Sequence, residues 1–337
     1  FLCCNRNKQS VTVNLKTPAG RDIIGRLAES SDVLVENFLP GTFDDWGLSY
    51  ATLSQRNPRL VYCSITGFGQ TGPRRDEPGY DIMIQALSGV MSITGEAAGP
   101  PMKLGVAISD ITAGLFATNS ILAALLARER TGRGDRIDTA LFDSTLAWLA
   151  NVGSNYLVTG QIPQRRGTEH PSIVPYQAFA AEDHSLIIAV GNDSQFVKFC
   201  GVIERPDLAC DSRFQTNAAR VQNRLELIPL LADILAQRPA AEWLSRLESA
   251  GVPCGPVNTI DRAFGDPQTV ARDMLIEVPH PTIGPLKLAG SPFKLAAASP
   301  LPRRPPPLLG EHTASVLERV LGLTATEISE LRRQQVV

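Results

Sequence analysis

The sequence predicts an α/β protein with a parallel sheet in a large domain and a smaller α+β domain after it. From residue 10 to about 157, short apolar runs that resemble strands alternate with helical patterns. Such alternation is typical of a parallel sheet covered by helices on both faces. A stretch rich in glycine, proline and arginine at 159–175 then ends the alternation. We therefore expect the large domain at 1–160, a linker with the small domain at 161–280, and a connector with C-terminal helices at 281–337.

The strands and helices of the large domain follow in order along the chain. The first run, SVTVNL, alternates apolar and polar residues as a half-buried strand does. Thr17 and Pro18 then supply an N-cap and a first-turn proline for the first helix. Gly132 ends the longest helix, whose last turn is rich in arginine. Strands are expected at 10–15, 31–38, 59–66, 103–108 and 136–142, and helices at 18–30, 50–56, 80–94, 110–130 and 143–157.

The later part of the chain contains a hairpin pattern and separate helices in place of the alternation. Its proline-rich run, SPLPRRPPPLLG, predicts a stiff connector without regular structure. We expect a hairpin at 176–191, helices at 194–202, 217–236 and 240–250, the connector at 299–310, and final helices at 312–322 and 324–335.

Composition and charge exclude several classes of protein. The formal net charge is −2 with basic and acidic residues interspersed, so no nucleic-acid partner is expected. No apolar run has the length of a membrane span, so no membrane partner is expected, and no signal peptide is visible. The six cysteines and four histidines lack the spacing of a metal site, which predicts no bound metal and free thiols in a reducing compartment. We expect the protein in a bacterial cytoplasm or a mitochondrion and not among secreted proteins.

The loop GFGQTGPRRDEPGYD, residues 67–81, contains a match to the G-x-G-x-x-G pattern of dinucleotide-binding turns. That pattern works only when a helix starts at the turn and points its amides at the pyrophosphate. Pro73 follows the last glycine of the pattern, and Pro78 follows five residues later. A second proline in the next turn does not fit a helix. The match is therefore interpreted as accidental, and a nicotinamide oxidoreductase is the least favoured function.

Asp110 is the residue with the most promising position for chemistry. It lies in GVAISDITAGLFA, where an expected strand ends and the longest helix begins. Ligands of open α/β sheets bind at that edge, and a helix N-terminus favours an ionised carboxylate. The alternative is a plain N-cap, in which Ser109 or Asp110 satisfies the first-turn amides. The signatures G-x-S-x-G, the P-loop and H-E-x-x-H do not occur.

Several motifs in a constant order resemble the class III CoA-transferases, the family of formyl-CoA transferase and carnitine CoA-transferase. The motifs are VENFLPG, GFGQTGP, PGYD, QALSG, GVAISDITAGLFA, ILAALLARERTGRG and LLGEHT. SIVPYQAF and RPPPLLGEHT resemble the succinyl-CoA:glutarate branch most. The resemblance implies a Rossmann-like large domain and an interlocked homodimer in which the late segment returns to that domain. It also implies acyl-CoA and carboxylic acid substrates, with a CoA thioester as substrate and no permanently bound cofactor.

The same resemblance assigns roles to residues of the large domain. Asp110 matches the nucleophile, which attacks a thioester carbonyl to give a mixed anhydride and then an aspartyl-CoA thioester. Tyr80 and Asp81 match residues beside it; a buried tyrosine at a helix start is the alternative for Tyr80. The CoA-binding residues are expected to be Asn37, Phe38, Arg6 and Lys8, with a core position as the alternative for Phe38 and a solvated cluster for the basic pair.

A second group of expected site residues follows residue 160. The loop from Gly167 to Pro175 takes the place of the family's glycine-rich active-site loop but lacks its run of glycines. Gly167, His170 and Ser172 are its expected site residues. Arg165 and Arg166 are candidates for the far carboxylate of a dicarboxylic acid, because an arginine fork suits that group. Surface charge without a ligand is the alternative for both.

Two other functions stay open beside the transferase. The α-methylacyl-CoA racemases resemble this chain in the PGYD region but carry histidine at the position of Tyr80, and racemisation needs that second proton-transfer group. A non-catalytic CoA-binding fragment is the other alternative. Family members have a further strand–helix segment before NRNK, which supplies part of the CoA pocket. This sequence begins at FLCCNRNK without a methionine, so part of that pocket is expected to be missing from it.

Overall fold

The computed structural model describes residues 1–297 and 303–337. The chain divides into two compact units. The first unit comprises residues 1–92, 102–163 and 272–337, and the second comprises 93–101 and 164–271. The predicted α/β class is confirmed, with a parallel sheet in the first unit and an antiparallel sheet with helices in the second.

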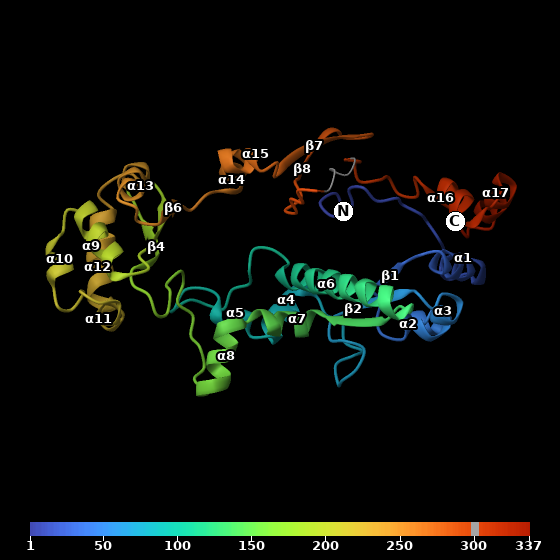
Figure 1. Cartoon of the computed structure of the whole chain (residues 1–337), viewed down its shortest axis with the longest axis horizontal. Helices are drawn as coiled ribbons and strands as arrows, with labels where there is room; N and C mark the ends of the chain where they lie inside the picture. Colours follow the sequence, from blue (N-terminus) through green and yellow to red (C-terminus); the bar gives the residue numbers. More distant parts are fainter. Residues whose placement is uncertain (298–302) are drawn as a thin grey trace. The chain divides into compact units, whose positions relative to one another are not determined.

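The first unit is built on a parallel sheet, in which the described residues supply three strands in the order β1-β2-β3. These strands are β1 (Val33–Glu36), β2 (Val61–Thr66) and β3 (Arg136–Ala140). The central strand is buried on both faces, as its apolar run predicts. Helix α6 (Ile108–Thr131) packs against β2 and β3, and Figure 1 shows it lying along the sheet. The start of α6 therefore lies near the carboxyl ends of the strands.

The remaining elements of the first unit are short helices and one hairpin. They are α1 (Pro18–Glu29), α2 (Thr42–Asp45), α3 (Tyr50–Arg56), α4 (Asp81–Leu87), α5 (Val90–Ile93), α7 (Leu141–Trp148), α8 (Ala150–Thr159), β7 (Leu275–His280), β8 (Gly284–Ala289), α16 (Thr313–Leu321) and α17 (Ala325–Arg333). Thr17 caps α1 as predicted, since its hydroxyl accepts from the Gly20 amide at 3.0 Å. The two helices expected at 80–94 and 143–157 are each divided, by Gly89 with φ +88° and by Ala150 with φ +46°.

Two of the expected strands are absent from the structure. Residues 10–15 lie beside the C-terminal segment instead of a strand (Figure 1), where the Asn14 amide donates to the Val336 carbonyl at 2.8 Å. The segment 103–107 has no strand partner either, and the Leu104 amide donates to the side chain of Gln85 at 2.9 Å. A short apolar segment was a wrong signal for a strand at both places, because other groups satisfy the backbone. Residues 299–302 of the expected connector lie outside the described residues, and 303–308 have no regular structure.

Among the helices in the described part of the chain, only α6 is long and apolar enough to cross a membrane, judged by length and composition. No apolar run of this length was expected from the sequence; in α6, threonine, asparagine and serine interrupt the apolar residues between 112 and 120. Sheet-covering helices of globular proteins meet the same criterion. The contacts of α6 with β2 and β3 are those of such a helix.

The second unit surrounds an antiparallel sheet of β4 (Tyr176–Ala180), β5 (Ser185–Ala189) and β6 (Cys254–Pro256). Its helices are α9 (Asp193–Val202), α10 (Asp207–Cys210), α11 (Asn217–Gln222), α12 (Arg224–Leu235), α13 (Ala240–Ser249), α14 (Ile260–Gly265) and α15 (Pro267–Ala271). Trp243 and four phenylalanines are in its core. The fully buried Arg220 is held there by Asp193 at 2.9 Å and lies over the Phe196 ring. Burying a charged side chain away from water costs free energy, and partners such as these offset that cost.

Candidate active site at the start of helix α6

The loop 67–79 brings two candidate residues to the end of β2. Its two ends cross at Gly67 and Gly79, so closely that a Cβ added to Gly79 would lie 2.2 Å from the Gly67 Cα. Only glycine permits this approach. Residues 73–80, all described, contain no helix, so the G-x-G-x-x-G match is not followed by the helix of a dinucleotide turn. Its glycines shape a closed loop, after which Tyr80 and Asp81 begin α4.

Asp81 caps the helix that carries Asp110. The N-cap residue of α6, Ala107, has no side chain that can accept a hydrogen bond from the first turn. The Ser109 amide instead donates to Asp81 Oδ1 at 2.9 Å, across from α4 to α6. This bond satisfies one of the free amides of a helix N-terminus. Asp110 is the third residue of α6, so it lies in the same turn and next to the capping carboxylate.

Asp110 is an exposed carboxylate whose pKa is raised. Partial loss of water around it raises its pKa above the ordinary value, and the negative charge of Asp81 raises the pKa further. The helix N-terminus acts in the opposite sense, because it favours the ionised form. The net direction is upward, so the Asp110 carboxylate is a stronger base than a free aspartate.

An open pocket of about 570 Å³ lies over these residues. Five of the expected site residues line it, together with loop and strand residues of the first unit; the five are Asn37, Phe38, Tyr80, Asp81 and Asp110. A pocket of this size accommodates a small-molecule ligand.

The aromatic residues of the pocket are available to a ligand. Tyr80 is 70% exposed, so it is not the buried tyrosine that the sequence analysis left open. Phe38 is 41% exposed, and its ring stacks on Phe43 at 5.1 Å with Trp46 edge-on at 5.3 Å. One face of Phe38 is thus packed on other rings while the side chain keeps an exposed part. Asn37 Nδ2 donates to the Ile65 carbonyl at 2.7 Å, which joins the turn after β1 to β2.

The basic residues near the N-terminus do not line this pocket. Arg6 is half-buried and donates to the Ala289 carbonyl of β8, and Lys8 is exposed. The neighbouring Asn7 exchanges hydrogen bonds with Arg304, so the segment is held by the C-terminal part of the first unit.

The other expected site residues belong to the second unit. The Gly167 amide donates to the Gly95 carbonyl at 2.9 Å, and His170 Nδ1 accepts from the Ser172 amide at 3.1 Å. Arg165 donates to the carbonyl oxygens of Glu96 at 3.3 Å and Gly99 at 2.8 Å.

Arg166 is exposed to solvent, whereas Arg165 is half-buried. The expected site is therefore divided between the two units, and the open pocket joins the five residues of the first.

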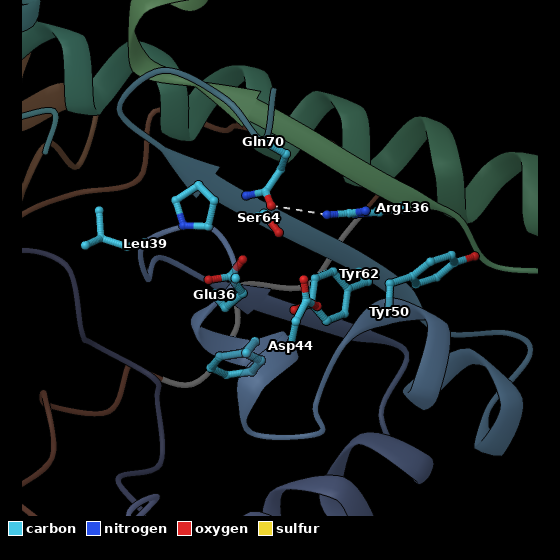
Figure 2. Close-up of a pocket in the computed structure, with 11 residues that line it drawn as sticks. Glu36, Leu39, Asp44, Tyr50, Tyr62, Ser64, Gln70 and Arg136 are labelled. Atoms are coloured by element: carbon cyan, nitrogen blue, oxygen red, sulfur yellow. Dashed lines mark hydrogen bonds between the residues drawn. The ribbon is translucent and has the colours of Figure 1, made fainter. Parts of the chain in front are cut away.

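A second, smaller pocket of about 10 Å³ lies beside Gln70 of the loop 67–79, with room for about one water molecule. Figure 2 shows Glu36, Tyr62 and Ser64 facing it, and the side-chain oxygen of Gln70 accepting from Arg136 at 3.2 Å. Burial, with the charge of Glu36, raises the pKa of Tyr62. This pocket is too small for a substrate, and its polar contacts fasten the loop to β3.

Gln85 was not among the site residues expected from the sequence. Its side chain is fully buried, and its Nε2 donates to Asp81 Oδ2 at 2.7 Å. The signal was present, because Gln85 is a polar residue four positions after Asp81 in an otherwise apolar helix.

Comparison with known proteins gives this geometry a context. Residues 1–313 match the profile of CoA-transferase family III. The chain belongs to this family. The mouse succinyl-CoA:glutarate CoA-transferase is 43% identical over 336 residues, which cover 98% of this chain and 76% of that protein. The acetyl-CoA:oxalate CoA-transferase of Acetobacter aceti is 42% identical over 94% of this chain and 80% of that protein.

A solved structure of a CaiB/BaiF family protein from Brucella suis has the same architecture. It superposes with a TM-score of 0.86 at 43% identity and covers 95% of this chain and 83% of that one. The resemblance to the class III CoA-transferases is thereby confirmed, and the protein is a family III CoA-transferase. Among the described residues, no group of three or more histidine, cysteine, aspartate or glutamate side chains is arranged to hold a metal ion.

The pair of carboxylates predicts a pH effect in this family III CoA-transferase. Asp81→Asn removes the charge that raises the pKa of Asp110, so that pKa is expected to fall. A carboxylate acts as a nucleophile only in its ionised form. The acid limb of a pH–rate profile of CoA transfer, where activity is lost as pH falls through the pKa, is therefore expected at lower pH in the variant. Titration of the Asp110 carboxyl by ¹³C NMR, assigned with Asp110→Asn, checks the same shift; an unchanged or higher pKa in the variant contradicts the account.

Proposed function

We propose that the protein moves CoA from succinyl-CoA to a dicarboxylic acid through covalent intermediates on Asp110. The observation that carries this proposal is the exposed Asp110 carboxylate at the N-terminus of α6, beside Asp81 and inside an open pocket. The name of the mouse relative supports succinyl-CoA as donor and glutarate as the first acceptor to test. The Acetobacter relative acts on oxalate, another dicarboxylate, so malate and citramalate belong in the same test.

The proposed reaction is an exchange in two halves. Asp110 attacks the thioester carbonyl of the donor, which gives a mixed anhydride and the CoA thiolate. The thiolate then attacks the aspartyl carbonyl, which releases succinate and leaves an aspartyl-CoA thioester. The incoming acid attacks this thioester, and the thiolate attacks the acceptor carbonyl of the second anhydride. Covalent catalysis of this kind divides one difficult exchange into easier steps.

Electrostatics at the start of α6 supports the proposed chemistry. A carboxylate with a raised pKa is a better nucleophile while it is ionised, and both loss of water and the charge of Asp81 raise the pKa of Asp110. Conversion of Asp110 to an anhydride or a thioester removes one of two neighbouring negative charges. The repulsion from Asp81 is thus relieved in the covalent intermediates, which favours their formation relative to the free enzyme.

The remaining site residues are proposed to bind the substrates. Tyr80, being exposed in the pocket, is placed to donate a hydrogen bond to an acyl oxygen, and Phe38 to stack on the adenine of CoA. Arg6 and Lys8 are proposed to contact phosphates. Of the pair proposed for the acceptor carboxylate, Arg166 is the better candidate, because Arg165 already holds backbone carbonyl oxygens.

Gly167, His170 and Ser172 of the second unit are proposed as residues of the active-site loop. We further propose that the enzyme works in a bacterial cytoplasm or a mitochondrion, which its six free thiols support.

We also propose that the enzyme works as a homodimer. Only 17% of the most apolar 18-residue window of α6 is buried within one chain. Ile111, Leu115, Phe116, Leu122 and Leu126 of this helix are exposed, and large exposed apolar patches mark interaction sites. A second copy of the chain is the occupant proposed, in agreement with the dimer that the family resemblance implies.

The covalent mechanism predicts an adduct on one aspartate. Incubation with succinyl-CoA is expected to leave CoA on the peptide that contains Asp110, seen as a mass increase that hydroxylamine removes. Asp110→Asn is expected to abolish the adduct and to lower transfer at least about 1,000-fold, because it removes the nucleophile. Glutarate, malate, citramalate and oxalate are then added to the isolated adduct, and the acid that discharges it fastest to its own CoA thioester is the acceptor.

Two results of that experiment, and one of a separate assay with a 2-methylacyl-CoA, contradict the proposal. An adduct that persists in Asp110→Asn places the covalent chemistry elsewhere. Bound CoA without any acyl exchange indicates a non-catalytic CoA-binding protein. Exchange of the α-hydrogen of a 2-methylacyl-CoA with deuterium indicates a racemase instead.

The dimer proposal predicts the effect of a charge on the exposed face of α6. Leu122→Glu is expected to convert the dimer to monomer at micromolar concentration, because a charge in an apolar interface has to lose its water. Analytical ultracentrifugation measures the change. Leu225→Glu is the matched control, since Leu225 is 87% exposed on α12. A wild-type protein that sediments as a monomer, or a Leu122→Glu variant that remains dimeric, contradicts the proposal.

A further inference from the structure

Gln85 is the fully buried polar side chain beside the two carboxylates. Its Oε1 accepts from the Leu104 amide at 2.9 Å, and its Nε2 donates to Asp81 Oδ2 at 2.7 Å. A backbone amide can only donate, so the atom facing Leu104 has to be the oxygen of Gln85. The nitrogen of Gln85 therefore has to face Asp81. The orientation of this amide follows from its two partners.

The hydrogen bonds of Gln85 and Asp81 form one chain with a fixed direction. Leu104, just before α6, donates to Gln85; Gln85 donates to Asp81 Oδ2; and Ser109, inside α6, donates to Asp81 Oδ1. An ionised carboxylate only accepts, so it suits both donors. This series of hydrogen bonds begins at Leu104, five residues before Ser109, and ends at Ser109. Ser109 directly precedes Asp110. The first turn of α6 is thereby fastened to α4 on the side of the pocket.

We propose that Gln85 is a positioning residue for the transfer reaction, which holds the Asp81 carboxylate against the first turn of α6 and so keeps Asp110 in line with the thioester. The proposal rests on the function proposed for Asp110. Gln85 does not line the pocket, so it acts through Asp81 and touches no substrate.

The reaction itself gives the reason for such a residue. Asp110 alternates between a charged carboxylate and uncharged acyl forms, while Asp81 keeps its place beside it throughout. Without Gln85, Asp81 keeps one of the two bonds and gains freedom to rotate about its side-chain torsions. A loss of alignment near 1 Å at a reacting group lowers the rate by about 100-fold. Binding of the CoA part of the substrate is not affected, because Gln85 lies outside the pocket.

Gln85→Met tests the proposal, because methionine has a similar length and removes both hydrogen bonds. We expect kcat for CoA transfer to fall about 10- to 100-fold, with KM for succinyl-CoA within about twofold of wild type. Thr145→Val is the control. Thr145 is buried on α7, outside the pocket, and its hydroxyl donates to the Leu141 carbonyl at 2.8 Å, so the variant also loses a buried hydrogen bond. Its kcat is expected to stay within about twofold of wild type.

A swapped pair keeps the proposal testable if Gln85→Met does not fold. Gln85→Glu has the shape of glutamine and still accepts from Leu104, but it turns an oxygen toward Asp81. Adding Asp81→Asn restores every donor and acceptor match, because the new asparagine donates to the new glutamate and accepts from Ser109. We expect the swapped pair to exceed Gln85→Glu in kcat by at least about tenfold.

Failure of this inference is distinct from failure of the proposed function. If wild type forms no CoA adduct on Asp110, the proposed function is wrong and the inference with it. If wild type forms the adduct but Gln85→Met keeps the kcat of Thr145→Val, only the inference is overturned. A rise in KM at unchanged kcat, or a swapped pair no faster than Gln85→Glu, overturns it as well.

Discussion

The candidate site depends on the hydrogen bond that the Ser109 amide donates to the Asp81 carboxylate at 2.9 Å. Ala107, the N-cap residue of helix α6, provides no side-chain cap, so a residue from α4 accepts a hydrogen bond from the first turn of α6. Asp81 reaches this place because the loop before it closes on itself where Gly67 meets Gly79. One contact therefore joins the glycine crossing, the start of α4 and the turn that carries Asp110. The pocket lies where these three meet.

The same contact determines the charges of the site. Two carboxylates share one helix N-terminus, and loss of water around Asp110 together with their repulsion raises the pKa of Asp110. Asp81 already accepts from the Ser109 amide of this helix, so capping alone does not account for a second carboxylate beside it. A covalent mechanism benefits, because acylation of Asp110 removes one of the two charges. The polar contacts of Gln70 with Arg136 and Asp138, at 3.2 Å and 3.0 Å, fasten the loop to β3 and keep it in place.

Sequence patterns predicted the elements whose signals are local. Thr17 and Pro18 mark the start of α1, Gly132 ends α6 in the left-handed conformation, and the apolar run of β2 is buried as expected. The position of Asp110 in the first turn of α6 was predictable because a helix start after an apolar segment is visible in the sequence itself.

What the sequence did not reveal depends on contacts between distant segments. Residues 10–15 do not form the expected strand, because Asn14 donates a backbone hydrogen bond to Val336 in the C-terminal segment. The Leu104 amide likewise donates to the side chain of Gln85, 19 residues before it. The hydrogen bonds from Arg165 to the backbone carbonyl oxygens of Glu96 and Gly99 are also contacts between distant segments.

The most direct test of the central claim, that the Asp110 side chain is the nucleophile, is the oxygen isotope content of Asp110 after turnover. With succinyl-CoA and ¹⁸O-labelled glutarate, each anhydride exchange leaves one acceptor oxygen on the enzyme, so the peptide containing Asp110 is expected to gain ¹⁸O. Continued turnover with no label on that peptide would contradict the account.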